Sequence, residues 1–206
     1  MTEGLRSEIP AANTLHLCAD MQRLFAEETP WYTPWMKRIS GTVAQIAERH
    51  ASRTIFTRFI PPRRPTDMPG RWQAYYRQWR EMTRERLDPE LLKLIDPLAS
   101  LVPPARVWDK SVYSPFFASA LHRMLQTENV NTLVVTGGET DICVLATVLD
   151  AIDYGYRIIL PRDALCSSSD HTHEALMTLY QNRFAHQIEV CSSKELLASW
   201  RAAPTK

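Results

Sequence analysis

Four cysteines are the side chains of this 206-residue chain best suited to nucleophilic chemistry: Cys18, Cys143, Cys166 and Cys191. No two of them have CxxC spacing, so the pattern predicts neither a zinc ribbon nor a disulfide scaffold. Cys143 stands apart because it follows Gly-Gly-Glu-Thr-Asp-Ile, where a strand pattern turns into a helix that Thr140 or Asp141 can cap. The free N–H groups and dipole of a helix start favour a thiolate and can hold an oxyanion. We therefore expect Cys143 to be a nucleophile, whereas Cys18, Cys166 and Cys191 are expected in the core or in loops.

Strands and helices alternate along the chain and must position this residue. Strand patterns cover residues 14–20, 53–59, 105–109, 131–138, 156–161 and 186–191, and helical patterns cover 36–50, 71–86, 116–127, 143–154, 171–184 and 193–200. The alternation predicts a three-layer α/β/α Rossmann-like fold with a mostly parallel six-stranded sheet. Ligands bind beyond the carboxyl ends of such strands, so the residues at those ends are candidates. They are Asp20, Arg58, Phe59, Asp109, Lys110, Cys143 and Asp163.

Composition excludes several classes of protein. Hydrophobic residues make up 45% and charged residues 23% of the chain, and the formal net charge is +1, which argues against a nucleic-acid coat protein. No apolar run approaches the roughly 20 residues that span a bilayer. The phosphate-binding patterns GxGxxG and GxxxxGK[ST] are missing from the sequence. We expect a flexible arm over residues 1–12 and a single cytoplasmic domain over 13–206, with neither a nucleic-acid nor a membrane partner.

Three ordered motifs resemble those of the isochorismatase-like cysteine hydrolases, the group that includes nicotinamidases and N-carbamoylsarcosine amidases. The first is Asp20-Met21-Gln22 with Phe25, the second is Asp109-Lys110 with Ser114 and Phe116, and the third is Thr140-Asp141-x-Cys143-Val144 followed by Thr147, Asp150, Ala151, Gly155 and Tyr156. A weaker fourth is Asp163-Ala164 with Ser167 and Ser168. Together they cover residues 14–190, so the resemblance implies the isochorismatase-like hydrolase fold for nearly the whole chain.

The resemblance implies a catalytic triad of Asp20, Lys110 and Cys143. In this triad Cys143 is the nucleophile, Asp20 the general base and Lys110 the cation, roles that agree with what a carboxylate and an ammonium do beside a thiol. It implies hydrolysis of a small-molecule amide or carbamoyl C–N bond through a thioester. It also implies a cis peptide at Gly138-Glu139, an oxyanion turn of Gly138, Glu139, Ile142 and Cys143, and a homodimer or homotetramer.

The stretch after the second strand departs from the nicotinamidases of this family, which carry a metal-binding Asp-x-His there. Residues 57–62 read Thr-Arg-Phe-Ile-Pro-Pro and contain no such ligand. His171 and His173 are two apart at a helix start, where side chains do not face each other, so we interpret them as helix-end polar residues. We predict no metal and no cofactor, which makes nicotinamidase activity less expected.

Glu139 is a second departure, because an acid next to the nucleophile repels a thiolate unless it is paired or turned away. Arg58 is a candidate partner. Glu139 could instead receive an amine or guanidine of the substrate, or bind a loop or a neighbouring subunit. The predicted pocket residues are Phe25, Trp31, Arg58, Trp72, Tyr113, Phe116 and Glu139, with Tyr76 and Trp79 as further candidates from the aromatic 71–86 helix.

Two other functions compete with a cysteine-dependent amidase. An isochorismatase-type vinyl-ether hydrolase would protonate its substrate with Asp20 and would not need Cys143. A non-catalytic binding member of the fold would need none of Asp20, Lys110 and Cys143. Substitution of Cys143 by Ala or Ser separates the three hypotheses.

Overall fold

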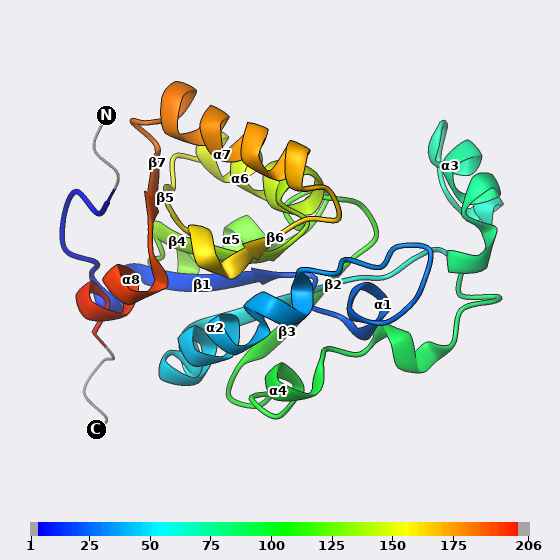
Figure 1. Cartoon of the computed structure of the whole chain (residues 1–206), viewed down its shortest axis with the longest axis horizontal. Coiled ribbons are helices and arrows are strands. Elements are labelled where there is room, and N and C mark those ends of the chain that lie inside the picture. The colour runs from blue at the N-terminus through cyan, green and yellow to red at the C-terminus, as the bar shows by residue number, and fades with distance from the viewer. Residues whose placement is uncertain (1–3, 202–206) are drawn as a thin grey trace.

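A seven-stranded parallel sheet forms the centre of the molecule (Figure 1). The structure is a computed structural model and describes residues 4–201. The strands lie in the order β3-β2-β1-β4-β5-β7, and β6 pairs with β4. Their bounds are Thr14–Ala19 (β1), Thr54–Phe59 (β2), Arg106–Lys110 (β3), Thr132–Gly138 (β4), Arg157–Pro161 (β5), Leu165–Cys166 (β6) and Ile188–Cys191 (β7). Every pairing is parallel, and the order reverses between β1 and β4.

Eight α-helices accompany the strands within residues 4–201. They are α1 (Arg23–Ala26), α2 (Met36–Arg49), α3 (Trp72–Gln78), α4 (Asp96–Ala99), α5 (Leu121–Thr127), α6 (Leu145–Asp153), α7 (Asp170–Arg183) and α8 (Ser193–Ser199). The longest, α2 and α7, have 14 residues each. In this part of the chain, no helix is long and apolar enough to cross a membrane.

Two hydrophobic clusters, one on each face of the sheet, make the three layers. Helices α2, α4 and α8 cover one face, and α5, α6 and α7 cover the other (Figure 1). Alternation along β1 sends Leu15 and Leu17 to the second cluster and Cys18 to the first. All six residues of β1 are buried, as expected for the central strand of a parallel sheet. The predicted three-layer fold is confirmed.

The structure corrects three predicted elements. Strand β6 was missed because it has only two residues, which pair with Gly137 and Gly138, and so carries no pattern of its own. The helix predicted at 116–127 begins only at Leu121, because Ser119 binds the Pro115 carbonyl and the Leu121 N–H and so competes with a first helical turn. The helix predicted at 71–86 ends at Gln78 and continues as a 3₁₀ turn, Arg80–Met82.

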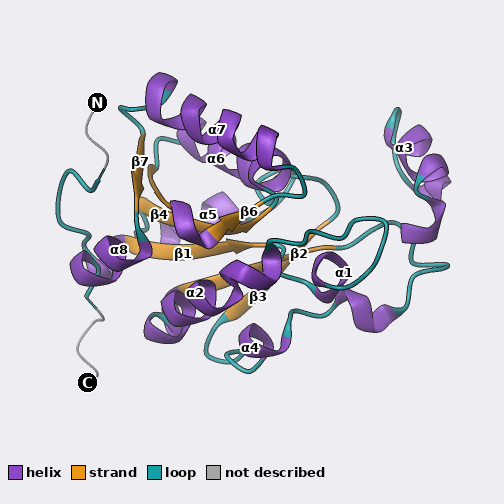
Figure 2. Cartoon of the chain, in the orientation of Figure 1, coloured by secondary structure: helices purple, strands orange, loops and turns teal. Residues whose placement is uncertain are grey.

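The connection between β2 and β3 extends beyond the carboxyl edge of the sheet. Figure 2 shows that it is mostly loop, with α3 at its far end. Gln22 ties this region to the sheet: its side-chain oxygen accepts from the Phe59 N–H at 2.6 Å, and its side-chain nitrogen donates to the Leu92 carbonyl at 2.9 Å. The connection therefore overhangs the edge at which the candidate residues lie.

Residues 4–9 of the predicted arm contact β7. The Gly4 N–H donates to the Val190 carbonyl at 3.0 Å, the Arg6 N–H donates to Glu189 at 2.9 Å, and Ile9 is buried. Residues 1–3 and 202–206 lie outside the described residues, and the flexibility of the arm and the domain limits stay predictions.

Candidate active site

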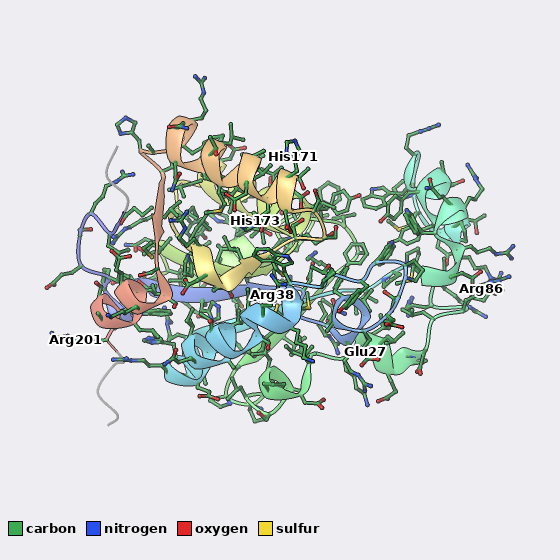
Figure 3. The ribbon with its side chains drawn as sticks, viewed as in Figure 1. Glu27, Arg38, Arg86, His171, His173 and Arg201 are labelled. Atoms are coloured by element: carbon green, nitrogen blue, oxygen red, sulfur yellow. The ribbon has the colours of Figure 1, made fainter. Side chains whose placement is uncertain are left out.

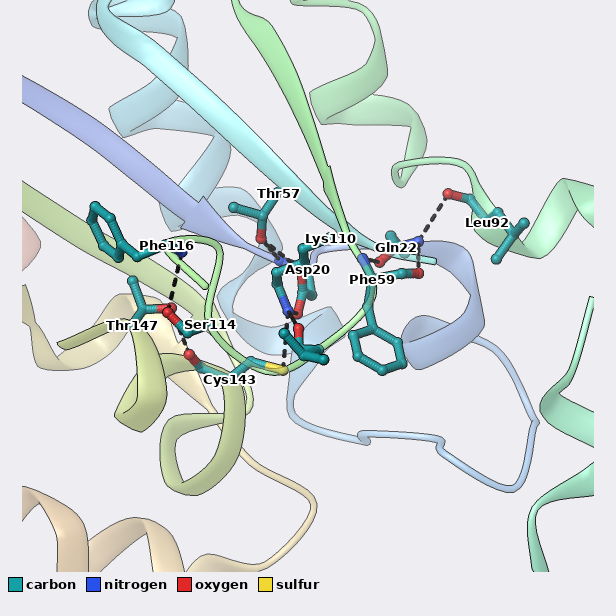
Figure 4. Close-up of polar contacts among 11 residues, drawn as sticks. Asp20, Gln22, Thr57, Phe59, Leu92, Lys110, Ser114, Phe116, Cys143 and Thr147 are labelled. Carbon is teal, nitrogen blue, oxygen red and sulfur yellow. Dashed lines mark hydrogen bonds and ion pairs between the residues drawn. The ribbon is translucent and has the colours of Figure 1, made fainter. Parts of the chain in front are cut away.

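Asp20 follows directly after β1 and is almost completely buried. Its φ of 48° is in the left-handed region, which Asp tolerates better than most residues, and it turns the side chain across the end of the sheet. Thr57 of β2 donates its hydroxyl proton to Asp20 Oδ1 at 2.6 Å, and the Asp20 N–H donates to the same hydroxyl oxygen at 3.2 Å (Figure 4). These two bonds fix the carboxylate.

Lys110, the last residue of β3, joins Asp20 to Cys143. Its Nζ lies 2.7 Å from Asp20 Oδ2 and 3.4 Å from Cys143 Sγ (Figure 4). It also lies 3.2 Å from the Val112 carbonyl. Burial alone lowers the pKa of Lys110, but the charges and hydrogen bonds of Asp20 and Cys143 outweigh burial and raise it. Lys110 is therefore an ammonium ion that contacts both other residues.

The turn that carries Cys143 depends on two glycines at the end of β4. Gly137 has a φ of +97°, and a Cβ there would lie 2.1 Å from the Ala19 carbonyl oxygen, so no larger residue fits. The Gly138-Glu139 peptide is cis, as the family resemblance implied. A single π-helical turn, Thr140–Val144, then leads into α6, and Thr147 binds the Cys143 carbonyl at 2.6 Å. Cys143 thus lies at a helix start, as predicted.

The resting protonation state of Cys143 differs from the expected thiolate. Burial is the largest effect and raises the pKa of Cys143, the Lys110 charge lowers it, and the charge and hydrogen bond of Asp20 raise it again; the net direction is upward. The buried sulfur therefore keeps its proton at neutral pH, next to a carboxylate that can accept it. The sequence could not show this outcome, because it depends on the depth of burial.

The predicted N-cap residues have other roles. No side chain caps this turn; the Thr140 hydroxyl donates to the Cys166 carbonyl at 3.0 Å, and Asp141 accepts from the Ser167 hydroxyl. Since the single Thr140 hydroxyl proton is already used, the His173 Nδ1–H donates to Thr140 Oγ1 at 2.9 Å. These contacts hold the nucleophile turn against β6, the residue that follows it and the start of α7.

One of the predicted oxyanion donors is occupied. The Ile142 N–H donates to the Glu139 carbonyl at 3.1 Å, and the Val144 N–H donates to the same oxygen at 3.0 Å. The expectation that the Ile142 N–H serves an oxyanion is therefore corrected, because its proton already has an acceptor. The N–H groups of Glu139 and Cys143 are the candidates that are left in this turn.

A cavity of about 370 Å³ opens onto Cys143. Four of the predicted pocket residues line it, namely Phe25, Trp31, Tyr113 and Glu139, and so does the further candidate Trp79. The other lining residues are Pro30, Tyr32, Phe59, Tyr75, Ile142, Cys143 and Ser168. The volume suits a small molecule, and the walls are mainly aromatic.

Three predicted pocket residues, and the further candidate Tyr76, which is buried, do not line this cavity. Arg58 points to the neighbouring strand and forms a two-bond ion pair with Asp109, at 2.7 and 2.8 Å, so it is not the partner of Glu139. Trp72 lies behind the wall, with its ring 4.9 Å from that of Tyr113. Phe116 is buried in the second cluster, where its ring packs against Tyr156.

Sequence reasoning missed three residues at this site. Thr57 carries no signal of its own as a strand residue, although its place near the end of β2, beside Asp20, was a usable one. Tyr75 lies four residues before Trp79, and both rings reach Trp31, with centroid distances of 6.1 and 6.4 Å. His173, interpreted as a helix-end polar residue, is buried against Thr140, and no local pattern indicates that contact.

The two histidines at the start of α7 differ in their exposure. His171 is exposed and His173 is buried at the start of α7 (Figure 3). Within residues 4–201 no three His, Cys, Asp or Glu side chains are grouped to hold a metal ion.

The parallel sheet, with Asp20, Lys110 and Cys143 grouped at its carboxyl edge, defines the class of isochorismatase-like α/β hydrolases. The Isochorismatase domain model matches residues 14–192, and the chain belongs to this family. The chain is thus an isochorismatase-family hydrolase.

Individual relatives agree with this assignment. An uncharacterized isochorismatase family protein of Bacillus subtilis, YaaI, is 33% identical over 116 residues, which cover 55% of this chain and 60% of that protein. A probable inactive nicotinamidase of Arabidopsis thaliana is 29% identical over 170 residues, 79% of this chain and 85% of that protein. The fold of a cysteine hydrolase from Pseudomonas syringae pv. phaseolicola matches with a TM-score of 0.81 over 97% of each chain, at 24% identity.

Proposed function

We propose that this protein is a cysteine-dependent hydrolase that cleaves a small-molecule amide or carbamoyl C–N bond through a thioester on Cys143. The observation that carries the proposal is the position of Lys110 Nζ, 2.7 Å from Asp20 Oδ2 and 3.4 Å from Cys143 Sγ. An ammonium ion so placed pairs with the carboxylate of the base and stabilises negative charge on the sulfur as it forms.

The first half of the reaction forms the thioester. Asp20 takes the proton from the Cys143 thiol as the sulfur attacks the carbonyl carbon, and the oxyanion is held by the N–H groups of Glu139 and Cys143. The C–N bond then breaks, and the leaving nitrogen takes the proton from Asp20. Ammonia or an amine departs, and the acyl group stays on sulfur.

The second half regenerates the enzyme. Asp20, ionised again, takes a proton from a water molecule, whose oxygen attacks the thioester carbon. The C–S bond breaks, the acid leaves, and the sulfur recovers its proton from Asp20. Lys110 stays charged throughout, because both of its partners carry or develop negative charge during the cycle.

The cavity supports a small, flat substrate. Its volume of about 370 Å³ and its aromatic walls fit a planar group packed between rings. Cys143 is among the lining residues, so a carbonyl bound there would meet the sulfur directly. This placement favours the amidase over vinyl-ether hydrolysis, which would not need a thiol in the cavity wall.

The test is release of ammonia from a panel of small amides, ureas and carbamoyl amino acids by the parent and by Cys143→Ala and Asp20→Asn. We expect turnover of at least one compound by the parent and none above background by either variant. Turnover retained in Cys143→Ala but lost in Asp20→Asn would instead support the vinyl-ether type of chemistry. A parent that binds a compound but converts none would support a non-catalytic member of the fold.

A further inference from the structure

We propose that the cavity at Cys143 recognises a substituted ammonium group. The amide substrate would then be a cation, an inference that rests on the proposed function. The recognition site consists of the Glu139 carboxylate and the rings of Trp31, Tyr75 and Trp79, which together line one cavity. We call this set the cation pocket.

The charge balance of the cavity is negative. Glu139 is the one charged side chain among the lining residues described. Next to the cavity, Asp20 and Lys110 form a buried ion pair at 2.7 Å and so offset each other, while the pKa of Cys143 is raised and the thiol is neutral. A ligand therefore meets a net charge of about −1, which favours a cation over an anion.

Glu139 is held in place but has no cationic partner in the described part of the chain. Its Oε1 accepts from the Ser168 N–H at 2.9 Å, a bond that orients the carboxylate. No ion pair to Glu139 occurs within residues 4–201, and Arg58, the expected partner, is bound to Asp109 instead. A carboxylate in a largely aromatic wall is costly without a counter-charge, and a bound cation would supply one.

The rings of the cation pocket add the second half of the recognition. Trp31 lies centrally, with centroid distances of 6.1 Å to Tyr75 and 6.4 Å to Trp79. Ammonium groups bind within about 6 Å of such ring centres, most strongly on Trp. Phe59, another wall residue, already has the Lys110 ammonium 4.9 Å from its ring centre, so this aromatic wall accommodates a cation.

The ionisation of the tyrosines agrees with a negative field in the cavity. Burial is the largest cause of the raised pKa values of Tyr75 and Tyr113, and the charge of Glu139 raises both further. The negative charge that disfavours ionisation of these phenols would stabilise a cation bound in the same cavity.

The test compares choline with 3,3-dimethylbutan-1-ol, which has the same shape and no charge, by protection of Cys143 from alkylation with iodoacetamide. We expect choline to protect at concentrations at least about tenfold lower than the neutral compound. In Glu139→Gln, which keeps an oxygen for the Ser168 N–H, that preference should fall about tenfold. Glu48→Gln, on the exposed side of α2, is the matched control and should keep the preference for choline. Equal protection by the two compounds, or a full preference in Glu139→Gln, would overturn the proposal.

A second variant keeps the test decisive if Glu139→Gln does not fold. Trp79→Leu leaves the carboxylate in place and removes one ring, so protection by choline should weaken severalfold while protection by the neutral compound stays nearly constant. Equal weakening for both compounds would contradict cation recognition. Because protection does not require turnover, loss of the choline preference and failure of ammonia release are separate results, and the second would count against the proposed function alone.

Discussion

Thr57 and Asp20 exchange two hydrogen bonds at the ends of neighbouring strands: the threonine hydroxyl donates to the carboxylate at 2.6 Å and accepts from the Asp20 N–H at 3.2 Å. The pair fixes both the backbone and the side chain of the proposed base. Asp20 has a left-handed backbone conformation, which its hydrogen bonds to Thr57 help to maintain. The orientation of Asp20 toward Lys110 therefore depends on β2 as well as on β1.

Substitution of Thr57 by Val should lower kcat/KM about tenfold or more and cost about 1.5–3 kcal/mol of stability, because a hydrogen bond to a charged group is lost. Thr57→Ser keeps the hydroxyl and should retain most of both. Ammonia release and urea unfolding measure the two effects. If Thr57→Val and Thr57→Ser behaved alike, the hydroxyl would have no role in holding the base.

Replacement of Lys110 by Met should abolish turnover and destabilise the fold by about 3–5 kcal/mol, because it leaves the Asp20 carboxylate buried without a counter-charge. Lys37→Met, on the exposed side of α2, is the control and should change stability by less than about 0.5 kcal/mol. Chemical denaturation at neutral pH gives both values. A Lys110→Met protein as stable as the control would contradict the ion pair.

The ion pair of Lys110 and Asp20 predicts how the stability of the fold depends on pH. The pKa of Lys110 is raised in the folded protein, so its contribution is complete below the ordinary lysine value of about 10.4 and is lost as the pH rises through the higher folded value. The stability difference between the parent and Lys110→Met should therefore shrink only above about pH 10.5. A difference that already shrinks between pH 7 and 9 would contradict the sign of the shift.

Removal of the Asp20 charge should speed the alkylation of Cys143, although it should stop catalysis. The Asp20 charge raises the pKa of Cys143 and the Lys110 charge lowers it, so Asp20→Asn should react faster with iodoacetamide at pH 8 and Lys110→Met slower. Each unit of pKa change alters the thiolate fraction about tenfold. Peptide mapping should find Cys143 modified first, since the other cysteines do not line the cavity. Preferential modification of Cys166 would count against this account.

The Gly137 turn should not tolerate alanine. A Cβ there would meet the Ala19 carbonyl oxygen at 2.1 Å in addition to the strain of a positive φ, and we expect Gly137→Ala to cost more than about 3 kcal/mol or to prevent folding. Gly155→Ala also has a positive φ, +82°, but open space around it, and should cost only about 1–2 kcal/mol. Thermal unfolding of the two variants separates close packing from backbone strain.

Sequence alone predicted most of the fold, because each long strand has its own apolar pattern and is followed by a helical one. It also predicted that Asp20, Lys110 and Cys143 lie at one edge, since parallel strands end on the same side of a sheet. These conclusions rest on the local spacing of apolar residues and on the alternation of strands and helices, and both can be recognised in the sequence.

Contacts between elements could not be predicted in the same way. Arg58 was expected beside Glu139, but it is in register with Asp109 on the neighbouring strand, and the cross-strand ion pair determines its direction. Tyr75 of α3 and Trp79, just after α3, reach Trp31 because of the path of the β2–β3 connection, and no local pattern fixes that path. Loop geometry and tertiary pairing therefore decided which predicted wall residues line the cavity.

The most direct measurement is the intact mass of the protein after acid quenching during turnover of an amide from the panel. We expect the mass of one acyl group on the parent, located at Cys143 by peptide mapping, and no such adduct on Cys143→Ala, which should not release ammonia. Steady turnover by Cys143→Ala, or an acyl group attached to any other residue, would contradict the thioester mechanism.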